Sequence, residues 1–230
     1  MKVVLFGSTG MIGQGVLREC LRDSTVTQVL TVVRSATGRT HPKLKEVCTP
    51  DLFDLTGLEP DLQGADACFD CLGVSAVGMG EADYARLTYD LTLSIAETLV
   101  RLNPGMTFIY VSGAGTDSSE QGRSMWARVK GRTENALQRL PFGRVYLFRP
   151  CFIQPRHGIR SRTQWYRVFY ALSSPFIWLI NKFVPGVVLN TESLGWAILT
   201  AAQKGAPKAV LEARDLNLLA KAQATRWRSA

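Results

Sequence analysis

A glycine-spaced segment near the amino terminus constrains this sequence more than any other feature. Glycines stand at Gly7, Gly10 and Gly13, between an apolar stretch typical of a strand and a stretch with helical spacing. The first glycine permits a tight turn out of the strand, the second lets the backbone approach a pyrophosphate, and the third lets helix and strand pack closely. Free N–H groups at the start of the helix attract phosphate. This arrangement predicts a dinucleotide-binding loop made of the consecutive residues Gly7, Ser8, Thr9, Gly10, Met11, Ile12 and Gly13.

The end of the second predicted strand indicates which dinucleotide is bound. An acidic residue there, about 20 residues past the glycines, would hold the ribose 2′-hydroxyl of NAD. This sequence instead has Arg34, directly after the apolar run 28–33, and Arg39 lies close behind. A guanidinium is suited to a 2′-phosphate. The pattern favours NADP(H) over NAD, and the alternative is an exposed loop arginine with no ligand.

Strands and helices alternate along most of the chain. We expect strands at 2–6, 28–33, 44–48, 66–72, 106–111 and 145–148, and helices at 12–21, 84–102 and 124–140. This alternation predicts one α/β domain over residues 1–230, a Rossmann-like fold with a doubly wound parallel sheet. After Pro150 the pattern becomes mostly helical, at 165–183, 192–203 and 215–222. We expect residues 151–230 to form a small, mostly helical C-terminal cap over the carboxyl ends of the strands.

The cysteines point to a reducing compartment. Five cysteines, an odd number spread over the chain, favour free thiols in a cytoplasmic protein. Cys68 and Cys71 have the spacing of a redox or zinc motif. In a strand, however, side chains three positions apart lie on opposite faces, so we predict no site there and no metal site elsewhere. The longest apolar stretch, 168–180, is shorter than the ~20 residues of a membrane span, and no signal peptide is visible.

The charge of the chain bears on its partners. The net charge is +8, and the basic excess lies in residues 116–230. A solvated basic face is the simplest interpretation, and a small anionic substrate the functional one. An aromatic-rich stretch at 165–178, beside the basic residues 156–162, fits a substrate lid, a membrane-surface contact, or a helix packed on the core or on a second subunit of a homodimer. Nucleic acid is the least favoured partner, because no nucleic-acid-binding module is recognisable.

Taken together, the motifs resemble the short-chain dehydrogenase/reductase superfamily, in particular its atypical branch of epimerase-like and Tat-interacting-protein-like members. The resemblance covers most of the chain. It rests on the glycine loop and on the segments Asp51–Asp54, Cys71–Gly73, Tyr110–Ala114, Trp126–Gly131 and Phe148–Pro150. It implies an oxidoreductase acting on a carbonyl or sugar-nucleotide substrate, or a nucleotide-sugar epimerase- or dehydratase-like isomerase.

The resemblance also implies contacts with the cofactor. Asp51 and Leu52 would line the adenine pocket. The adenosine ribose would pass Leu72, Gly73 and Val74, while Lys130 would bind the nicotinamide ribose. The nicotinamide itself would be bordered by Cys151, Phe152 and Ile153.

The catalytic group of the family is a serine with a tyrosine and a lysine four residues apart on one helical face. Ser112 and Lys130 match, and Trp126 stands at the tyrosine position. An indole N–H donates a hydrogen bond but does not release a proton near neutral pH. Three readings stay open. The protein turns over with another donor (Tyr166, Tyr170, Cys151 or water), it binds NADP(H) silently and regulates a partner, or the site is a relic.

Overall fold

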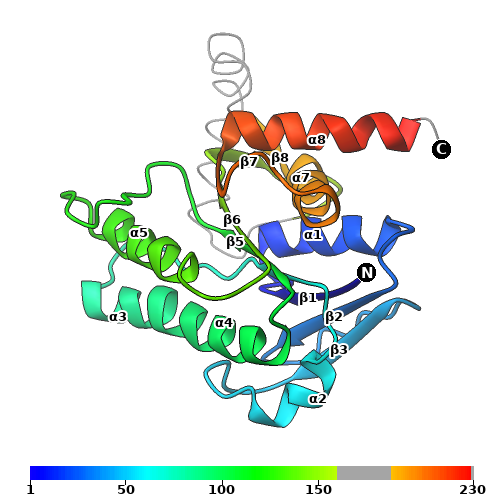
Figure 1. Ribbon diagram of the computed structural model, residues 1–230, viewed down its shortest axis with the longest axis horizontal. Coiled ribbons are helices and arrows are strands. Elements are labelled where there is room, and N and C mark those ends of the chain that lie inside the picture. The colour runs from blue at the N-terminus through cyan, green and yellow to red at the C-terminus, as the bar shows by residue number, and fades with distance from the viewer. Residues whose placement is uncertain (160–187, 229–230) are drawn as a thin grey trace.

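A parallel sheet organises the molecule. The computed structural model describes residues 1–159 and 188–228 (Figure 1). Within these residues, seven parallel strands pair in the order β3-β2-β1-β4-β5-β6-β9. They are β1 (Lys2–Phe6), β2 (Gln28–Val33), β3 (Leu44–Cys48), β4 (Ala67–Asp70), β5 (Thr107–Val111), β6 (Arg144–Arg149) and β9 (Val210–Glu212). The strand order reverses at β1 and β4, where doubly wound sheets bind ligands. The predicted Rossmann-like fold is confirmed.

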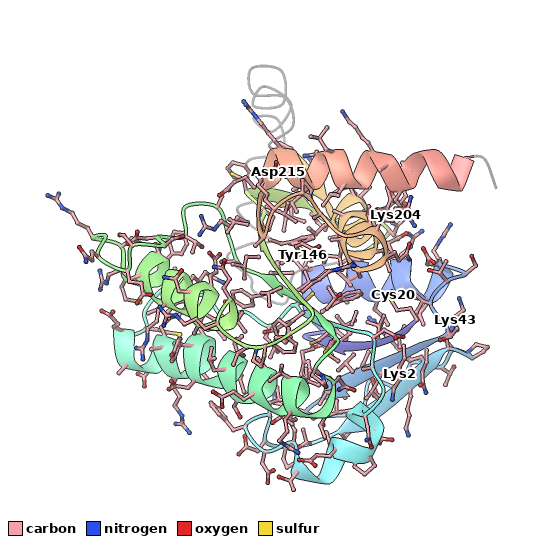
Figure 2. The ribbon with its side chains drawn as sticks, viewed as in Figure 1. Lys2, Cys20, Lys43, Tyr146, Lys204 and Asp215 are labelled. Atoms are coloured by element: carbon pink, nitrogen blue, oxygen red, sulfur yellow. The ribbon has the colours of Figure 1, made fainter. Side chains whose placement is uncertain are left out.

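One face of the sheet is covered by α1 (Met11–Arg22), α7 (Thr191–Lys204) and α8 (Ala213–Arg228). Figure 1 shows these helices layered on the same side of the strands. Their apolar side chains form one buried cluster with the strand residues that point toward them, among them Val3, Leu5 and Phe69. Cys20 on α1 and Tyr146 on β6, both labelled in Figure 2, belong to this cluster.

The other face carries a second helical layer, made of α3 (Glu81–Ala85), a π-helical turn η2 (Arg86–Asp90), α4 (Leu91–Leu102) and α5 (Met125–Leu137). A short turn η1 (Thr56–Leu58) and the helix α2 (Glu59–Leu62) lie near the β3 edge. Lys2, labelled in Figure 2, links β1 to this region because its ammonium donates to the carbonyls of Asp61 and Gln63 at 2.8 and 2.5 Å. The predicted helix at 84–102 is therefore helical throughout, with one π-turn inserted.

The C-terminal region is helical as predicted, but its described part is placed differently from a cap over the strand ends. Helix α7 packs against α1 on the face of the sheet, and β9 extends the sheet beyond β6. A small second sheet pairs β7 (Phe152–Gln154) with β8 (Val188–Asn190). The predicted helix at 165–183, with its aromatic residues and the candidate donors Tyr166 and Tyr170, lies outside the described residues.

Two glycines allow α1 and α7 to approach closely. A β-carbon on Gly15 would come within 2.7 Å of Thr191, and one on Gly195 within 2.7 Å of the Glu19 side chain. Glu19 is 1% exposed and accepts a hydrogen bond from the Trp196 indole at 2.9 Å. The C-terminal half is thereby fixed to the helix that follows the glycine loop.

Cys68 and Cys71 pack into the two different buried clusters, on opposite sides of the sheet. This is the opposite-face arrangement that their spacing in a strand predicts. No helix among residues 1–159 and 188–228 is long and apolar enough to cross a membrane.

Candidate functional site

The glycine loop has the geometry that the spacing predicts. Gly7 adopts a φ of +75°, and a β-carbon there would lie 2.5 Å from the Cys71 carbonyl oxygen of the neighbouring loop. A β-carbon on Gly13 would overlap the Gly7 carbonyl and lie 2.9 Å from the Ser8 α-carbon. Gly10 differs, because a β-carbon there would meet only the Gly7 carbonyl oxygen, at 3.3 Å. Gly7 and Gly13 thus close the loop, while Gly10 leaves room above it.

The loop presents unoccupied hydrogen-bond donors to that room. Gly10 caps α1 without a side-chain hydrogen bond, and the first turn of α1 holds no acidic residue. The first N–H groups of a helix lack partners within the helix and carry partial positive charge. A diphosphate fits this combination of open space, free donors and positive potential. The residues present therefore fit the pyrophosphate of a dinucleotide.

A cationic pocket lies beside the loop, with a volume of about 220 Å³. Its lining residues are Gln14, Arg18, Arg39, His157, Gly158 and Ile159. The Arg39 guanidinium donates to the Gln14 side-chain oxygen at 3.3 Å, and the Gln14 amide donates to the Thr9 carbonyl at 3.0 Å. These two bonds connect the segment after β2 to the glycine loop.

Among the described residues, some of the cationic side chains in and near this pocket are paired with carboxylates, and others are not. Arg18 pairs with Glu19, and a Glu192 carboxylate oxygen lies 3.6 Å from the Arg18 guanidinium and 3.2 Å from the His157 Nε2. Arg34 and Arg39 are exposed and form no ion pair with the described residues. The two arginines that the sequence singles out are therefore the cations most open to an anionic ligand.

One carboxylate that contacts the segment after β2 is already engaged by it. Glu46 on β3 accepts from the backbone N–H and the hydroxyl of Thr37, both at 2.7 Å. It holds the segment between β2 and β3 in place. No acidic residue stands at the end of β2, where one would bind a ribose 2′-hydroxyl.

The residues expected near adenosine lie after β3 and β4. Asp51 is exposed and its carboxylate accepts from the Phe53 N–H at 2.9 Å, while Leu52 packs against the apolar cluster. Leu72 is partly buried and Gly73 is exposed, as is Val74, an exposed large apolar side chain. Asp51 and Leu52 follow β3, the second strand from β1, and the other three residues follow β4, which pairs with β1. Because the strands are parallel, all five positions lie at the same sheet edge as the glycine loop.

The residues that match the family's catalytic group come from β5 and α5. The Ser112 and Thr116 hydroxyls lie 3.0 Å apart, and the Thr116 hydroxyl donates to the Gly113 carbonyl at 2.8 Å. The proton between the two hydroxyls therefore belongs to Ser112. Trp126 and Lys130 lie one turn apart on α5. A β-carbon on Gly115 would be 3.4 Å from the Trp126 ring, so the loop after β5 packs on the indole.

The Lys130 side chain lies in a buried polar layer that also contains Tyr110, Asp70 and Glu134. Its ammonium donates to the Tyr110 hydroxyl at 3.3 Å and lies 5.2 Å from the centre of the Tyr110 ring. Burial lowers the pKa of Lys130 to about 8, although the nearby carboxylates of Asp70 and Glu134 oppose the shift. Tyr110 is 1% exposed, and burial raises its pKa well above the ordinary value. Of the groups in this layer whose pKa lies above 7, Lys130 is therefore the one with the pKa closest to neutral pH.

Asp70, the last residue of β4, also belongs to this polar layer. It is fully buried, and burial raises its pKa to about 6. The Leu72 N–H, which donates to one carboxylate oxygen at 2.9 Å, offsets part of this rise, as do Lys130 and the Thr92 hydroxyl. The second oxygen, Oδ2, has no hydrogen-bond partner among the described residues. An acceptor left buried without a donor is costly and points to a functional role.

Glu134 and Arg149 anchor the same helix. The Glu134 carboxylate, fully buried, accepts from the Arg149 guanidinium nitrogen Nε at 3.0 and 3.1 Å. Arg149 also donates to the Ser118 hydroxyl at 2.6 Å. Two-pronged pairing of this kind fixes orientation as well as charge. The arginine of the Phe148–Pro150 segment thus holds α5 against β6.

The residues of the segment expected at the nicotinamide differ in their solvent exposure. Cys151 is exposed, Phe152 is partly buried, and Ile153 is 6% exposed within the cluster under α1 and α7. Burial and the charge of Glu212 raise the pKa of Cys151 above its ordinary value. A thiol shifted in this direction is a weaker proton donor than an ordinary one.

Sequence reasoning missed Asp70, Tyr110, Thr116 and Gln14. A carboxyl inside the otherwise apolar strand Ala67–Asp70 is a visible signal, because charged groups are rarely buried without a partner. Tyr110 belongs to the Tyr110–Ala114 motif and carries no separate signal in the sequence. Its contact with Lys130 joins a strand to a helix 20 residues later, and no local pattern predicts such a contact.

Relatives were found by sequence. Protein HTATIP2 of Rattus norvegicus is 26% identical over 190 residues, which cover 81% of this chain and 77% of the rat protein. Protein FMP52, mitochondrial, of Chaetomium globosum is 26% identical over 155 residues. That match covers 65% of this chain and 65% of the fungal protein, slightly less than two thirds. No protein-family model matches the chain.

Solved structures share the fold. The Bordetella bronchiseptica enzyme WbmF in complex with NAD⁺ superimposes with a TM-score of 0.65 and 18% identity, over 97% of this chain and 78% of that one. MoeE5 in complex with UDP-glucuronic acid and NAD gives a TM-score of 0.67 with 21% identity, over 92% and 76% of the two chains. At sequence identities this low, the similarity supports a shared fold and nothing more.

Proposed function

Since this chain belongs to the atypical short-chain dehydrogenase/reductase superfamily, we propose that it is an NADP(H)-dependent oxidoreductase acting on a small carbonyl or sugar-nucleotide substrate. The observation that carries the proposal is the glycine loop, with its closed turn at Gly7 and Gly13 and the open space above Gly10. When bound, the nicotinamide supplies or accepts a hydride.

The choice of NADP(H) rests on the residues around the end of β2. The 2′-phosphate that distinguishes NADP carries negative charge, and Arg34 and Arg39 are exposed cations there. The bond from Arg39 to Gln14, and from Gln14 to the loop carbonyl of Thr9, keeps one of these cations beside the glycine loop. The Glu46 carboxylate, which contacts the segment, is engaged by Thr37. NAD, the dinucleotide of the solved neighbours, is the alternative.

In this proposal the protein's own side chains orient the substrate. Ser112 donates to the reacting oxygen once its proton leaves the Thr116 hydroxyl, and Lys130 donates to the nicotinamide ribose. The Trp126 ring, packed beneath Gly115, forms a wall against which a substrate stacks. Trp126 donates at most one hydrogen bond and transfers no proton.

The test is NADPH oxidation over a broad panel of aldehydes, ketones and keto-sugar nucleotides, measured for the natural chain and for Trp126→Tyr. We expect turnover by the natural chain with at least one substrate class. A natural chain that is inert while Trp126→Tyr gains activity would instead favour a silent NADP(H)-binding protein that acts through a partner. The indole at the tyrosine position is the observation that favours this second candidate.

An isomerase is a third candidate. An epimerase- or dehydratase-like enzyme returns the hydride to its own substrate, so the cofactor is not consumed. Conversion of a sugar nucleotide without net NADPH oxidation, followed by NMR of the sugar, would identify it. A homodimer, an anionic substrate and a cytoplasmic location belong to the same proposal. The name of the fungal relative describes a mitochondrial protein, so the location needs its own fractionation experiment.

A further inference from the structure

The position of Trp126 raises the question of which side chain near the site releases a proton. Ser112 is an alcohol, whose proton is held near neutral pH. Tyr110 is a phenol, but its burial raises its pKa well above 10. Cys151 is exposed and its pKa is raised as well. None of these three groups is suited to donate a proton at pH 7, because an efficient general acid has a pKa near the working pH.

Lys130 meets that requirement and is held in place. One of its three N–H donors is taken by the Tyr110 hydroxyl at 3.3 Å, so two remain for ligands. The helix that carries it is fixed against β6 by the Glu134–Arg149 pair and against η2 by Arg132, whose guanidinium lies 3.9 Å from the centre of the Tyr89 ring. π-Turns such as η2 are frequent at functional sites.

The charged and titratable groups that face Lys130 come from three elements. Asp70 faces it from β4, Tyr110 from β5 and Glu134 from α5 itself. Glu134 is already paired with Arg149 of β6. Asp70 has no direct ion pair within 4.0 Å in the described part of the chain, and its buried Oδ2 lacks a hydrogen-bond partner there. Asp70 is therefore the carboxylate whose charge is left to balance the Lys130 ammonium.

Building on the oxidoreductase proposed above, we propose that Lys130 donates the proton that a tyrosine supplies elsewhere in the family, and that Asp70 is the positioning residue that keeps Lys130 charged. In reduction, an N–H bond of the Lys130 ammonium breaks and an O–H bond forms on the substrate oxygen. A reduced nicotinamide bound at the glycine loop would supply the hydride that the carbonyl carbon takes up. The neutral amine then takes up a proton from solvent, which restores the ammonium.

The first test uses the protein without ligands. The titration of Lys130 is followed by NMR of isotope-labelled lysine side chains, with Lys130→Arg to assign the signal. We expect a pKa of about 8 in the natural chain. Asp70→Asn removes the negative charge that favours the Lys130 ammonium, so the pKa of Lys130 should fall by roughly one unit. Asp90→Asn, at an exposed carboxyl, is the matched control and should leave it unchanged. A Lys130 that titrates near 10.5, or an unchanged value in Asp70→Asn, overturns the proposal.

The second test uses the pH dependence of turnover. With an accepted carbonyl substrate, kcat/KM for NADPH oxidation should fall as Lys130 loses its proton, and in Asp70→Asn the fall should begin at lower pH. If kcat/KM does not fall at the pH where the NMR signal of Lys130 titrates, the proton-donor role is overturned, even if NADPH binds. A protein that binds no NADPH overturns the proposed function and the donor role together, whereas the NMR titration alone tests the Asp70–Lys130 coupling. Each failure can thus be told apart.

Discussion

At Asp70, folding and the role proposed above make opposite demands. Burial disfavours its charged form, so its folded pKa of about 6 lies above the ordinary value of 3.8. The fold therefore favours the neutral carboxyl. That contribution to stability is fully present below pH 3.8 and is lost as the pH rises through about 6. At neutral pH the charged Asp70 destabilises the fold, and its role toward Lys130 accounts for why such a residue would be kept.

A stability measurement follows from this sign. Asp70→Asn should raise the free energy of unfolding at pH 8 by roughly 1 to 3 kcal/mol, because it removes a buried charge that the fold disfavours. At pH 4.5 the gain should fall to roughly a third of its value at pH 8. Urea unfolding of the natural chain and the variant at both pH values measures the difference. A variant that is equally destabilised at pH 8 and pH 4.5 would show that the carboxyl is stabilised by its surroundings, against the account given above.

At the scale of elements, the glycine loop separates folding from binding. A β-carbon on Gly13 would overlap backbone atoms of Gly7, which cannot move without opening the strand–helix turn. Gly13→Ala should therefore destabilise the protein by about 1–3 kcal/mol or more. Gly10, with a φ of −77°, tolerates a β-carbon 3.3 Å from the Gly7 carbonyl oxygen. Gly10→Ala should keep the fold and weaken dinucleotide binding, because the methyl group fills the space meant for the pyrophosphate.

Thermal unfolding and NADPH titration of both variants check this prediction. Equal effects of the two substitutions on stability and on binding would mean that Gly10 is only a packing glycine. The contrast between the two variants is sharper than either result alone, since both place the same methyl group within one loop.

Elements were predictable where local pattern decides them. The predicted strands at 2–6, 28–33 and 44–48 match the structure residue for residue. The first two are short, mostly apolar runs that end at turn residues, which leaves little choice of their bounds. The π-turn Arg86–Asp90 was not predictable, since one turn of α-helix and one of π-helix place apolar residues at nearly the same spacing. Strand β9 was missed as well. It has three residues, and only its pairing with β6 defines it.

At the scale of the whole molecule, the site combines a predictable and an unpredictable half. The dinucleotide half follows from the glycine spacing and from Arg34, which are local in sequence. The proposed catalytic half depends on Asp70, Tyr110 and Lys130, which come from β4, β5 and α5 and are far apart in the sequence. The C-terminal helices were expected over the strand ends, and α7 instead packs against α1, because Gly15 and Gly195 allow a close approach that periodicity does not reveal.

The central claim is that the glycine loop and the arginines after β2 bind NADP(H). The measurement that tests it most directly is a paired titration of NADPH and NADH, followed by quenching of tryptophan fluorescence, in the natural chain, Arg34→Ala and Arg39→Ala. We predict micromolar NADPH binding, weaker NADH binding, and a loss of NADPH affinity of about tenfold in each variant, with NADH affinity little changed. Equal affinity for the two dinucleotides, unaffected by either substitution, would contradict the NADP(H) assignment, and no binding of either would contradict the dinucleotide site itself.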